Sequence, residues 1–294
     1  MILCIDLGAT NIKVALFDET KQQPLAQVVK QIPTDARKGK SGILAALDKA
    51  VELRGSAEVV ALSSAGNIDS EAKILTYATD NLPGMSGFDY GKFFAERNLR
   101  AEVLNDAHAA LLGEMTFGAG KNITQKKVAM LTLGSGVGGG YWANGKIVSD
   151  QSNDYARYGH IALHRQGVCT CGKTGCAEIY LSGRAIHRRL PHYGLGNDVF
   201  DKLLRGDSAA NAFVDDFCAD FNLLLDKMQA VNAFDECIVG GGVVEWMGQA
   251  FSVVADRLRY PVVAAVLGNK AGLYGAFAFA CDKIRAEKSS ENKL

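Results

Sequence analysis

Residues 2–17 read Ile-Leu-Cys-Ile-Asp-Leu-Gly-Ala-Thr-Asn-Ile-Lys-Val-Ala-Leu-Phe, which is two short apolar runs around a glycine-containing turn. The runs at 2–6 and 12–17 predict a β-hairpin whose turn is formed by residues 8–11. The same order of strand, glycine turn and strand returns at residues 127–142, about 125 residues further along the chain. We interpret this recurrence as a weak internal duplication, so the chain should consist of two related halves.

The rest of the chain alternates between strand and helix patterns, which is typical of an α/β protein. Short apolar runs predict further strands at residues 59–62, 101–104, 127–133, 139–142, 146–148 and 236–239. Apolar residues at helical spacing predict helices at residues 42–53, 107–117, 213–228 and 268–280.

The composition narrows the classes of function. The 294 residues include 32 lysines and arginines and 32 aspartates and glutamates, so the formal net charge is zero. A balanced chain without a long basic run is not typical of proteins whose main partner is nucleic acid or an anionic membrane. No apolar run approaches a membrane span, and the strand pattern begins at Ile2, where a secretory leader would lie. We therefore expect a cytoplasmic protein.

A cluster of cysteines and one histidine is the most specific motif. His160, Cys169, Cys171 and Cys176 follow the spacing H-x8-C-x-C-x4-C, with glycines between the last two thiols. This is the ligand set of a tetrahedral zinc site. Chance clustering and a disulfide are the other readings, but the chain has seven cysteines and the expected cytoplasm is reducing. We predict a structural zinc that also fixes Glu178, which follows the motif, beside a ligand pocket.

Three glycine-rich turns follow strands and are candidates for binding a nucleotide. A carboxylate before the first turn can hold Mg²⁺ through water, while backbone N–H groups cradle phosphate oxygens. The second turn is bare of side chains where a polyanion would approach, and the third suits a base or ribose. The plainer interpretations of the first, second and third turns are, in that order, an ordinary hairpin with a capping aspartate, a flexible loop and a turn that begins a helix. The candidate residues are Asp6, Gly8, Thr10, Asn11, Gly134, Ser135, Gly136, Gly138, Gly240, Gly241 and Gly242.

Asn105 and Asp106 stand between an expected strand and an expected helix. The plain reading of Asp106 is a helix N-cap. The alternative is a general base that accepts a hydroxyl proton during phosphoryl transfer, since ligands of α/β folds bind at the carboxyl ends of strands.

Taken together, these motifs resemble the ROK family (repressors, open-reading-frame proteins and sugar kinases) of the hexokinase–actin-like superfamily. The resemblance covers nearly the whole chain. It rests on residues 6–10, 81–84, 105–107, 133–140, 159–160, 169–178, 240–242 and 271–276. It implies a two-lobed, actin-like ATPase fold of duplicated ribonuclease H-like halves with a cleft between the lobes. Residues 1–110, joined by a C-terminal helix at 275–294, would form the smaller lobe, and residues 111–274 the larger one.

The resemblance also implies an activity and roles for individual residues. The activity is ATP-dependent phosphorylation of a hexose or hexose derivative, usually at the 6-hydroxyl, with Mg²⁺ as cofactor, by a homodimer. Asp106 would be the catalytic base. The sugar contacts would be Asn81, Asn105, Asp106, His160 and Glu178, with His160 also a zinc ligand.

One position departs from the family pattern, which usually has a glutamate three residues before the zinc histidine. Here that residue is Arg157, a cation in place of a hydrogen-bond acceptor. Arg157 either points to solvent or enters the pocket, where it would favour an acidic, amidated or substituted sugar.

Two other functions compete with the sugar kinase. A sugar-responsive regulator would need an extra DNA-binding domain, for which the start at Ile2 leaves no room before the first strand. A sugar-binding pseudokinase is motivated by Arg157, whereas the presence of Asp106 favours an enzyme.

Overall fold

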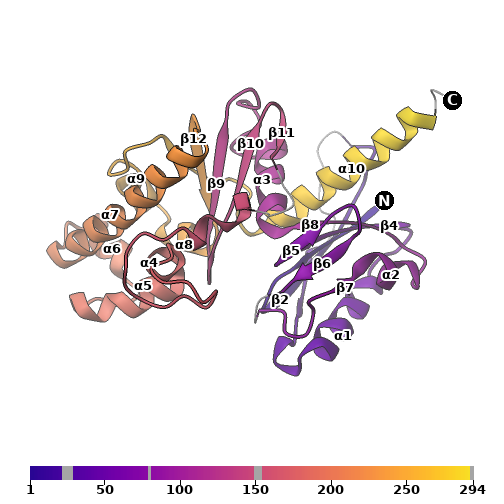
Figure 1. Cartoon of the computed structure of the whole chain (residues 1–294), viewed down its shortest axis with the longest axis horizontal. Coiled ribbons are helices and arrows are strands. Elements are labelled where there is room, and N and C mark those ends of the chain that lie inside the picture. The colour runs from indigo at the N-terminus through magenta and orange to yellow at the C-terminus, as the bar shows by residue number, and fades with distance from the viewer. Residues whose placement is uncertain (22–28, 79–80, 149–153, 292–294) are drawn as a thin grey trace. The chain divides into compact units, whose positions relative to one another are not determined.

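The computed structural model describes residues 1–21, 29–78, 81–148 and 154–291. The chain divides into two compact units. Unit 1 is Met1–Phe117 with Lys270–Leu294, and unit 2 is Gly118–Asn269. Each unit combines a β-sheet with helices, as predicted for an α/β protein (Figure 1). Within the described residues, no helix combines the length and apolarity that crossing a membrane requires.

Unit 1 is built on a five-stranded sheet with the order β3-β2-β1-β4-β8. β1 (Ile2–Leu7) pairs antiparallel with β2 (Asn11–Phe17), which confirms the predicted hairpin, and parallel with β4 (Val59–Ser64). The other elements of this unit are β3 (Val29–Pro33), α1 (Lys40–Val51), β5 (Asn67–Asp69), β6 (Ile74–Tyr77), β7 (Phe88–Asp89), α2 (Tyr90–Ala95), β8 (Arg100–Asn105), α3 (Asp106–Phe117) and α10 (Ala271–Glu291), with a short 3₁₀ turn at Ala36–Lys38.

Unit 2 repeats this sheet with the order β11-β10-β9-β12-β13. β9 (Val128–Leu133) pairs antiparallel with β10 (Val137–Ala143) and parallel with β12 (Glu236–Gly240). The other elements are β11 (Lys146–Ile147), η2 (Asp154–His160), α4 (Glu178–Leu181), α5 (Gly183–Arg189), η3 (Leu190–Tyr193), α6 (Val199–Leu204), α7 (Ser208–Val231), α8 (Gly242–Met247), α9 (Ala250–Ala255) and β13 (Val262–Ala264), and η4 (Gly268–Lys270) leads to α10.

The two sheets share one topology, a hairpin followed by two parallel strands, which confirms the duplication. β10 begins at Val137, earlier than predicted, because its backbone pairs with β9 from that residue. Gly138 therefore lies in a strand opposite Thr132 and not in the turn. A small third sheet, β5-β6-β7, was not predicted because its strands are too short to show periodicity.

Each unit has its own apolar core. In unit 1 the core lies around β1, β4 and α1, and in unit 2 it lies around β9, β12 and the buried face of α7. Small residues bring α3 against α10 within unit 1, and a Cβ on Gly275 would lie 1.6 Å from the carbonyl oxygen of Ala109. The predicted small-residue helix thus serves a close helix–helix contact.

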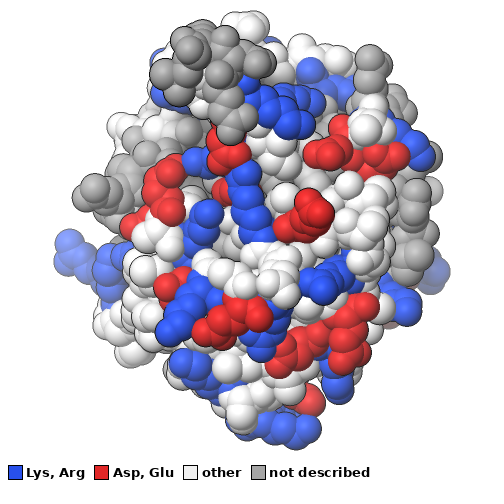
Figure 2. Space-filling model, turned by 90° about the vertical axis from the view of Figure 1, so that its right-hand side faces the viewer, with Lys and Arg blue, Asp and Glu red and all other residues white. Residues whose placement is uncertain are grey.

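Acidic and basic side chains are interspersed on the face of the molecule shown in Figure 2. This mixture is consistent with the equal numbers of acidic and basic residues in the chain.

Candidate functional site

In unit 1 the candidate residues gather where parallel strands end. Asp6 on β1 faces Lys13 on β2 and Ser63 on β4 in the sheet register. Its carboxylate forms an ion pair with the Lys13 ammonium at 3.2 Å and accepts a hydrogen bond from the Ser63 hydroxyl at 2.9 Å. The predicted magnesium-binding carboxylate is therefore already paired with a cation. We did not predict a role for Lys13 from the sequence. Its position directly opposite Asp6 in the predicted hairpin could have identified it.

Asp106 is the first residue of α3, and its side chain reaches solvent on one side while protein surrounds its carboxylate on the others. Desolvation by the surrounding protein, together with the negative charge of Asp6, raises the pKa of Asp106 to about 6. Such a carboxylate is ionised at neutral pH and is a stronger proton acceptor than an ordinary aspartate.

The helix cap that we assigned to Asp106 in the plain reading belongs mainly to Asn105. The Asn105 side-chain oxygen accepts hydrogen bonds from the backbone N–H groups of Ala107 at 2.9 Å and His108 at 3.1 Å. Its amide donates to the carbonyl of Gly66 at 2.8 Å. Asn105 is buried, and its side chain also hydrogen-bonds to the Asp106 carboxylate, which lowers the pKa of Asp106 against the larger upward effects.

The first glycine turn is braced from β3. Gly8 donates to the Asn11 carbonyl at 3.2 Å, and the buried Thr34 donates through its hydroxyl to the Gly8 carbonyl at 2.7 Å. The Thr34 N–H bonds the Thr10 carbonyl at 2.9 Å. Thr10 itself is exposed, as is Asn81 in another turn of the same unit.

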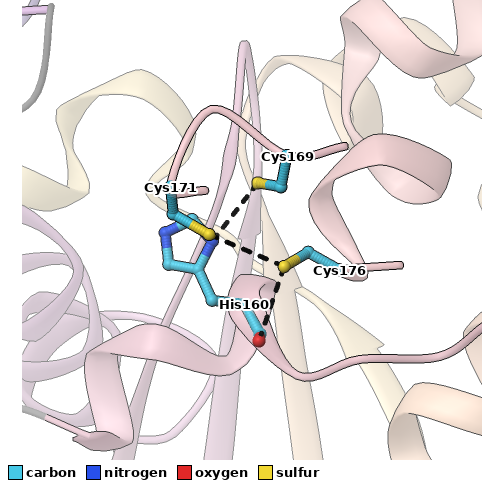
Figure 3. Close-up of side chains that lie close together, drawn as sticks. All are labelled: His160, Cys169, Cys171 and Cys176. Carbon is cyan, nitrogen blue, oxygen red and sulfur yellow. Dashed lines mark hydrogen bonds between the residues drawn. The ribbon is translucent and has the colours of Figure 1, made fainter. Parts of the chain in front are cut away.

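In unit 2 the four predicted metal ligands come together (Figure 3). Their ligand atoms all lie within 4.8 Å of one another. The Cys169 sulfur is 3.7 Å from His160 Nδ1, and the sulfurs of Cys171 and Cys176 are 3.7 Å apart. The three cysteines are free thiols. Two ligands held about 2.3 Å from one ion at the tetrahedral angle lie about 3.8 Å apart, so the donor set fits zinc.

Local backbone geometry explains why this segment folds around the cluster. Gly175 has a φ of +74°, and a Cβ there would lie 1.7 Å from the His164 carbonyl oxygen. The Gly175 carbonyl accepts from Leu163 at 2.7 Å, while Cys169 donates to Lys173 at 2.8 Å. These bonds close two short loops that aim the thiols at one point.

The histidine ligand reaches the cluster from η2, which packs tightly on β10. A Cβ on Gly139 would lie 2.4 Å from the Tyr158 ring, and one on Gly159 would lie 2.1 Å from the Val137 carbonyl oxygen. The glycine that follows the predicted phosphate-binding turn thus serves this packing. Desolvation lowers the pKa of His160. The positive charges of Arg157 and Lys173 also lower this pKa, whereas the negative charge of Glu178 raises it. The Arg157 side chain is exposed.

Glu178 links the cluster to the second glycine turn. Its carboxylate accepts the Val137 N–H at 3.0 Å and lies 4.0 Å from the Cys169 sulfur. A Cβ on Gly136 would lie 2.5 Å from that carboxylate, so the glycine makes room for it.

The other side of the turn contacts α5. Gly134 donates to the Gly136 carbonyl at 2.9 Å, which closes the turn. The Gly134 carbonyl accepts a hydrogen bond from the Gly183 N–H at 2.8 Å. The carbonyl of the exposed Ser135 accepts a hydrogen bond from Arg184 Nε at 2.7 Å. Arg184 was not predicted, because nothing in its local sequence marks it.

The third glycine turn begins a helix, as the plain reading predicted. Gly240 ends β12, and Gly241 precedes α8 with a φ of +92°. The Gly241 carbonyl accepts from Val244 at 3.0 Å, and a Cβ on Gly241 would lie 2.5 Å from the Leu133 carbonyl oxygen. At Gly242, by contrast, a Cβ would meet nothing within 4 Å.

Comparisons with known proteins agree with these features. Residues 2–283 match the ROK family. A glucokinase from Thermotoga maritima is 27% identical over 96% of this chain and 98% of its own length. An N-acetylmannosamine kinase from Shigella flexneri is 29% identical over 94% of this chain and 96% of its own. The crystal structure of a ROK family glucokinase from Streptomyces griseus, in complex with glucose and AMPPNP, is 26% identical with a TM-score of 0.75, covering 94% and 98%.

Proposed function

Because this chain belongs to the ROK family, we propose that it is an ATP-dependent sugar kinase acting on a hexose or hexose derivative. The relatives match over nearly their full lengths, which supports an enzyme of the same class. The fold is the two-lobed, actin-like ATPase type shared by the ROK kinases of known structure.

The raised pKa of Asp106 is the observation that supports this chemistry. We propose that its carboxylate accepts the proton of the sugar hydroxyl, the 6-hydroxyl in a hexose. The hydroxyl oxygen then bonds to the γ-phosphorus of ATP while the bond to the bridging oxygen breaks and ADP leaves. Mg²⁺, when bound with the nucleotide, neutralises phosphate charge. Asp6 and its partner Lys13 supply one carboxylate and one cation at the same end of the sheet.

The sugar contacts in this proposal are Asn81, Asn105, His160 and Glu178, with Arg157 as the residue that bears on sugar choice. Glu178 is held by the Val137 N–H and lies beside Cys169, so a zinc-bound cluster would fix its position. The nucleotide contacts are Asp6, Gly8, Thr10 and Asn11 in unit 1, and Gly134, Ser135, Gly136 and residues 240–242 in unit 2. Gly138, the remaining residue of the predicted set, is paired with Thr132 in the sheet and lies outside the turn.

We propose a structural role for the metal. His160 and the three cysteines would hold zinc, and the ion would tie η2 to the loop that precedes α4. The four protein ligands fill a tetrahedral site and leave no position for substrate, as is typical of structural zinc.

Coupled ADP release tests the proposal. The purified full chain is assayed with MgATP and with glucose, N-acetylmannosamine, fructose and a β-glucoside in turn. We expect turnover on at least one sugar. Sugar binding without turnover on any of them would overturn the kinase and favour a regulator or pseudokinase.

A further inference from the structure

Arg184 lies against the second glycine turn and has no role in the function proposed above. We propose that its guanidinium binds a phosphate group of the nucleotide at the Gly134–Ser135 side of that turn. This inference rests on the proposed kinase function and adds a nucleotide-binding residue to it.

Three segments of unit 2 meet at this place. Gly183 donates to the Gly134 carbonyl at 2.8 Å, and a Cβ on Gly183 would lie 3.2 Å from that oxygen and 3.4 Å from a methyl of Val243. The second and third glycine turns are therefore neighbours, and Arg184 follows the residue that joins them. Cβ atoms on Gly134 and Gly242 would meet nothing within 4 Å, so both turns are open here.

The opposite side of the turn, at Gly136, is less favourable for the phosphate itself, although it can still contact another part of the nucleotide. The Glu178 carboxylate already occupies the Val137 N–H at 3.0 Å and fills the space beside Gly136. A phosphate at Gly136 would face this negative charge at short range. A phosphate at Gly134 would lie further from it, on the side where Arg184 supplies a positive charge.

Arg184 is suited to this task by how it is held. Its side chain is exposed, and its Nε donates to the Ser135 carbonyl at 2.7 Å, which holds the guanidinium beside the turn. Within the described part of the chain, this is the single hydrogen bond of the side chain, so both terminal nitrogens are available. A guanidinium that is held through Nε and keeps its terminal donors available favours phosphate oxygens.

Calorimetry with ADP and with adenosine tests the role. In the zinc-loaded full chain, we expect Arg184→Gln to weaken ADP binding about tenfold, the scale of one charge-assisted hydrogen bond. Adenosine binding should change by less than about twofold, because adenosine carries no phosphate. Arg184→Lys keeps the positive charge but loses the paired donors of the guanidinium. Its ADP affinity should therefore lie between those of the wild type and Arg184→Gln.

Arg188→Gln is the matched control. Arg188 is one turn further along α5, is exposed, and also donates to a backbone carbonyl, that of Ile179 at 2.7 Å. This variant should bind ADP as the wild type does. Unchanged ADP binding in Arg184→Gln, or equal losses for ADP and adenosine, would overturn the inference while leaving the kinase intact. A wild-type chain that binds neither ADP nor MgATP would overturn the kinase proposal as well.

Discussion

At the scale of single residues, the chemistry depends on Asp106. We expect Asp106→Asn to lower kcat by about 10²-fold or more, the usual contribution of a general base. The amide keeps the shape of the side chain but cannot accept the proton, so the KM values should change little. Steady-state kinetics on the sugar identified by the ADP-release assay provide the measurement, and Asp18→Asn, at a half-buried position just after β2, is the control. Wild-type turnover in Asp106→Asn would refute the assignment.

The pKa of about 6 predicts how activity depends on pH. Since only the carboxylate accepts a proton, kcat/KM should rise with pH through about 6 and then level off. Stability should change in the opposite sense. The native pKa lies above the unfolded value of about 3.9, so the native state binds more protons in between, and stability falls as pH rises from about 4 to about 6. Asp106→Asn should remove this fall, which melting curves across this range can measure.

Residues also show where sequence reasoning reached its limit. The four metal ligands were predicted because their spacing in the chain is short, and the structure brings them together. Lys13 and Arg184 were missed because their partners lie on other elements. Gly139 follows the turn that we interpreted as phosphate-binding, and the ring of Tyr158 explains its missing side chain. A glycine alone does not distinguish room for a ligand from room for packing.

At the scale of elements, removal of zinc should unfold the segment between η2 and α4. The loop has few buried apolar side chains of its own, and Val168 at its tip is 80% exposed. A structural zinc contributes directly to folding, so we expect chelation or Cys171→Ser to lower the melting temperature by about 5 °C or more. Differential scanning fluorimetry with zinc analysis measures both quantities. Cys281→Ala, outside the cluster, should keep the metal, and an apo protein with unchanged melting temperature would contradict the prediction.

The contact between α3 and α10 gives a second prediction at this scale. Gly275→Ala would place a methyl group 1.6 Å from the backbone oxygen of Ala109, which cannot rotate away. We expect Gly275→Ala to lower the free energy of unfolding by about 1–3 kcal/mol, the usual cost of overpacking. Gly242→Ala makes the same change where the space is open, so it should be neutral or slightly stabilising. Denaturant titration compares them, and equal effects of the two substitutions would contradict the packing argument.

At the scale of the whole molecule, the duplicated architecture could be predicted from the sequence. The two hairpins were visible because β1, β2, β9 and β10 have regular apolar patterns. The units themselves depend on contacts between distant segments. α10 comes from the end of the chain but packs on α3, β1 and β4 of unit 1. Apolar patterns identify the helix and not its partners, which only the fold supplies.

This connectivity predicts that the two units differ in their ability to fold alone. Unit 2 is one continuous segment, Gly118–Asn269, whereas unit 1 needs Lys270–Leu294 as well. Without α10, unit 1 would expose the surface that Leu273 and Phe277 cover, and Phe277 stacks on Phe17 at 4.8 Å. Each such side chain is worth about 1.5–3 kcal/mol when buried, a large part of the stability of a small domain.

We therefore expect a fragment of residues 118–269 to fold when supplied with zinc, and a fragment of residues 1–117 to remain unfolded. Adding residues 270–294 to the latter through a short Gly-Ser linker should restore its fold, because the missing helix then becomes available at high effective concentration. Circular dichroism and cooperative thermal melting measure this for all three fragments. The same linker followed by residues 270–294 with Leu273→Asp and Phe277→Asp is the control, since it keeps the length but removes the apolar face. A cooperative melt of residues 1–117 alone would show that α10 is not required.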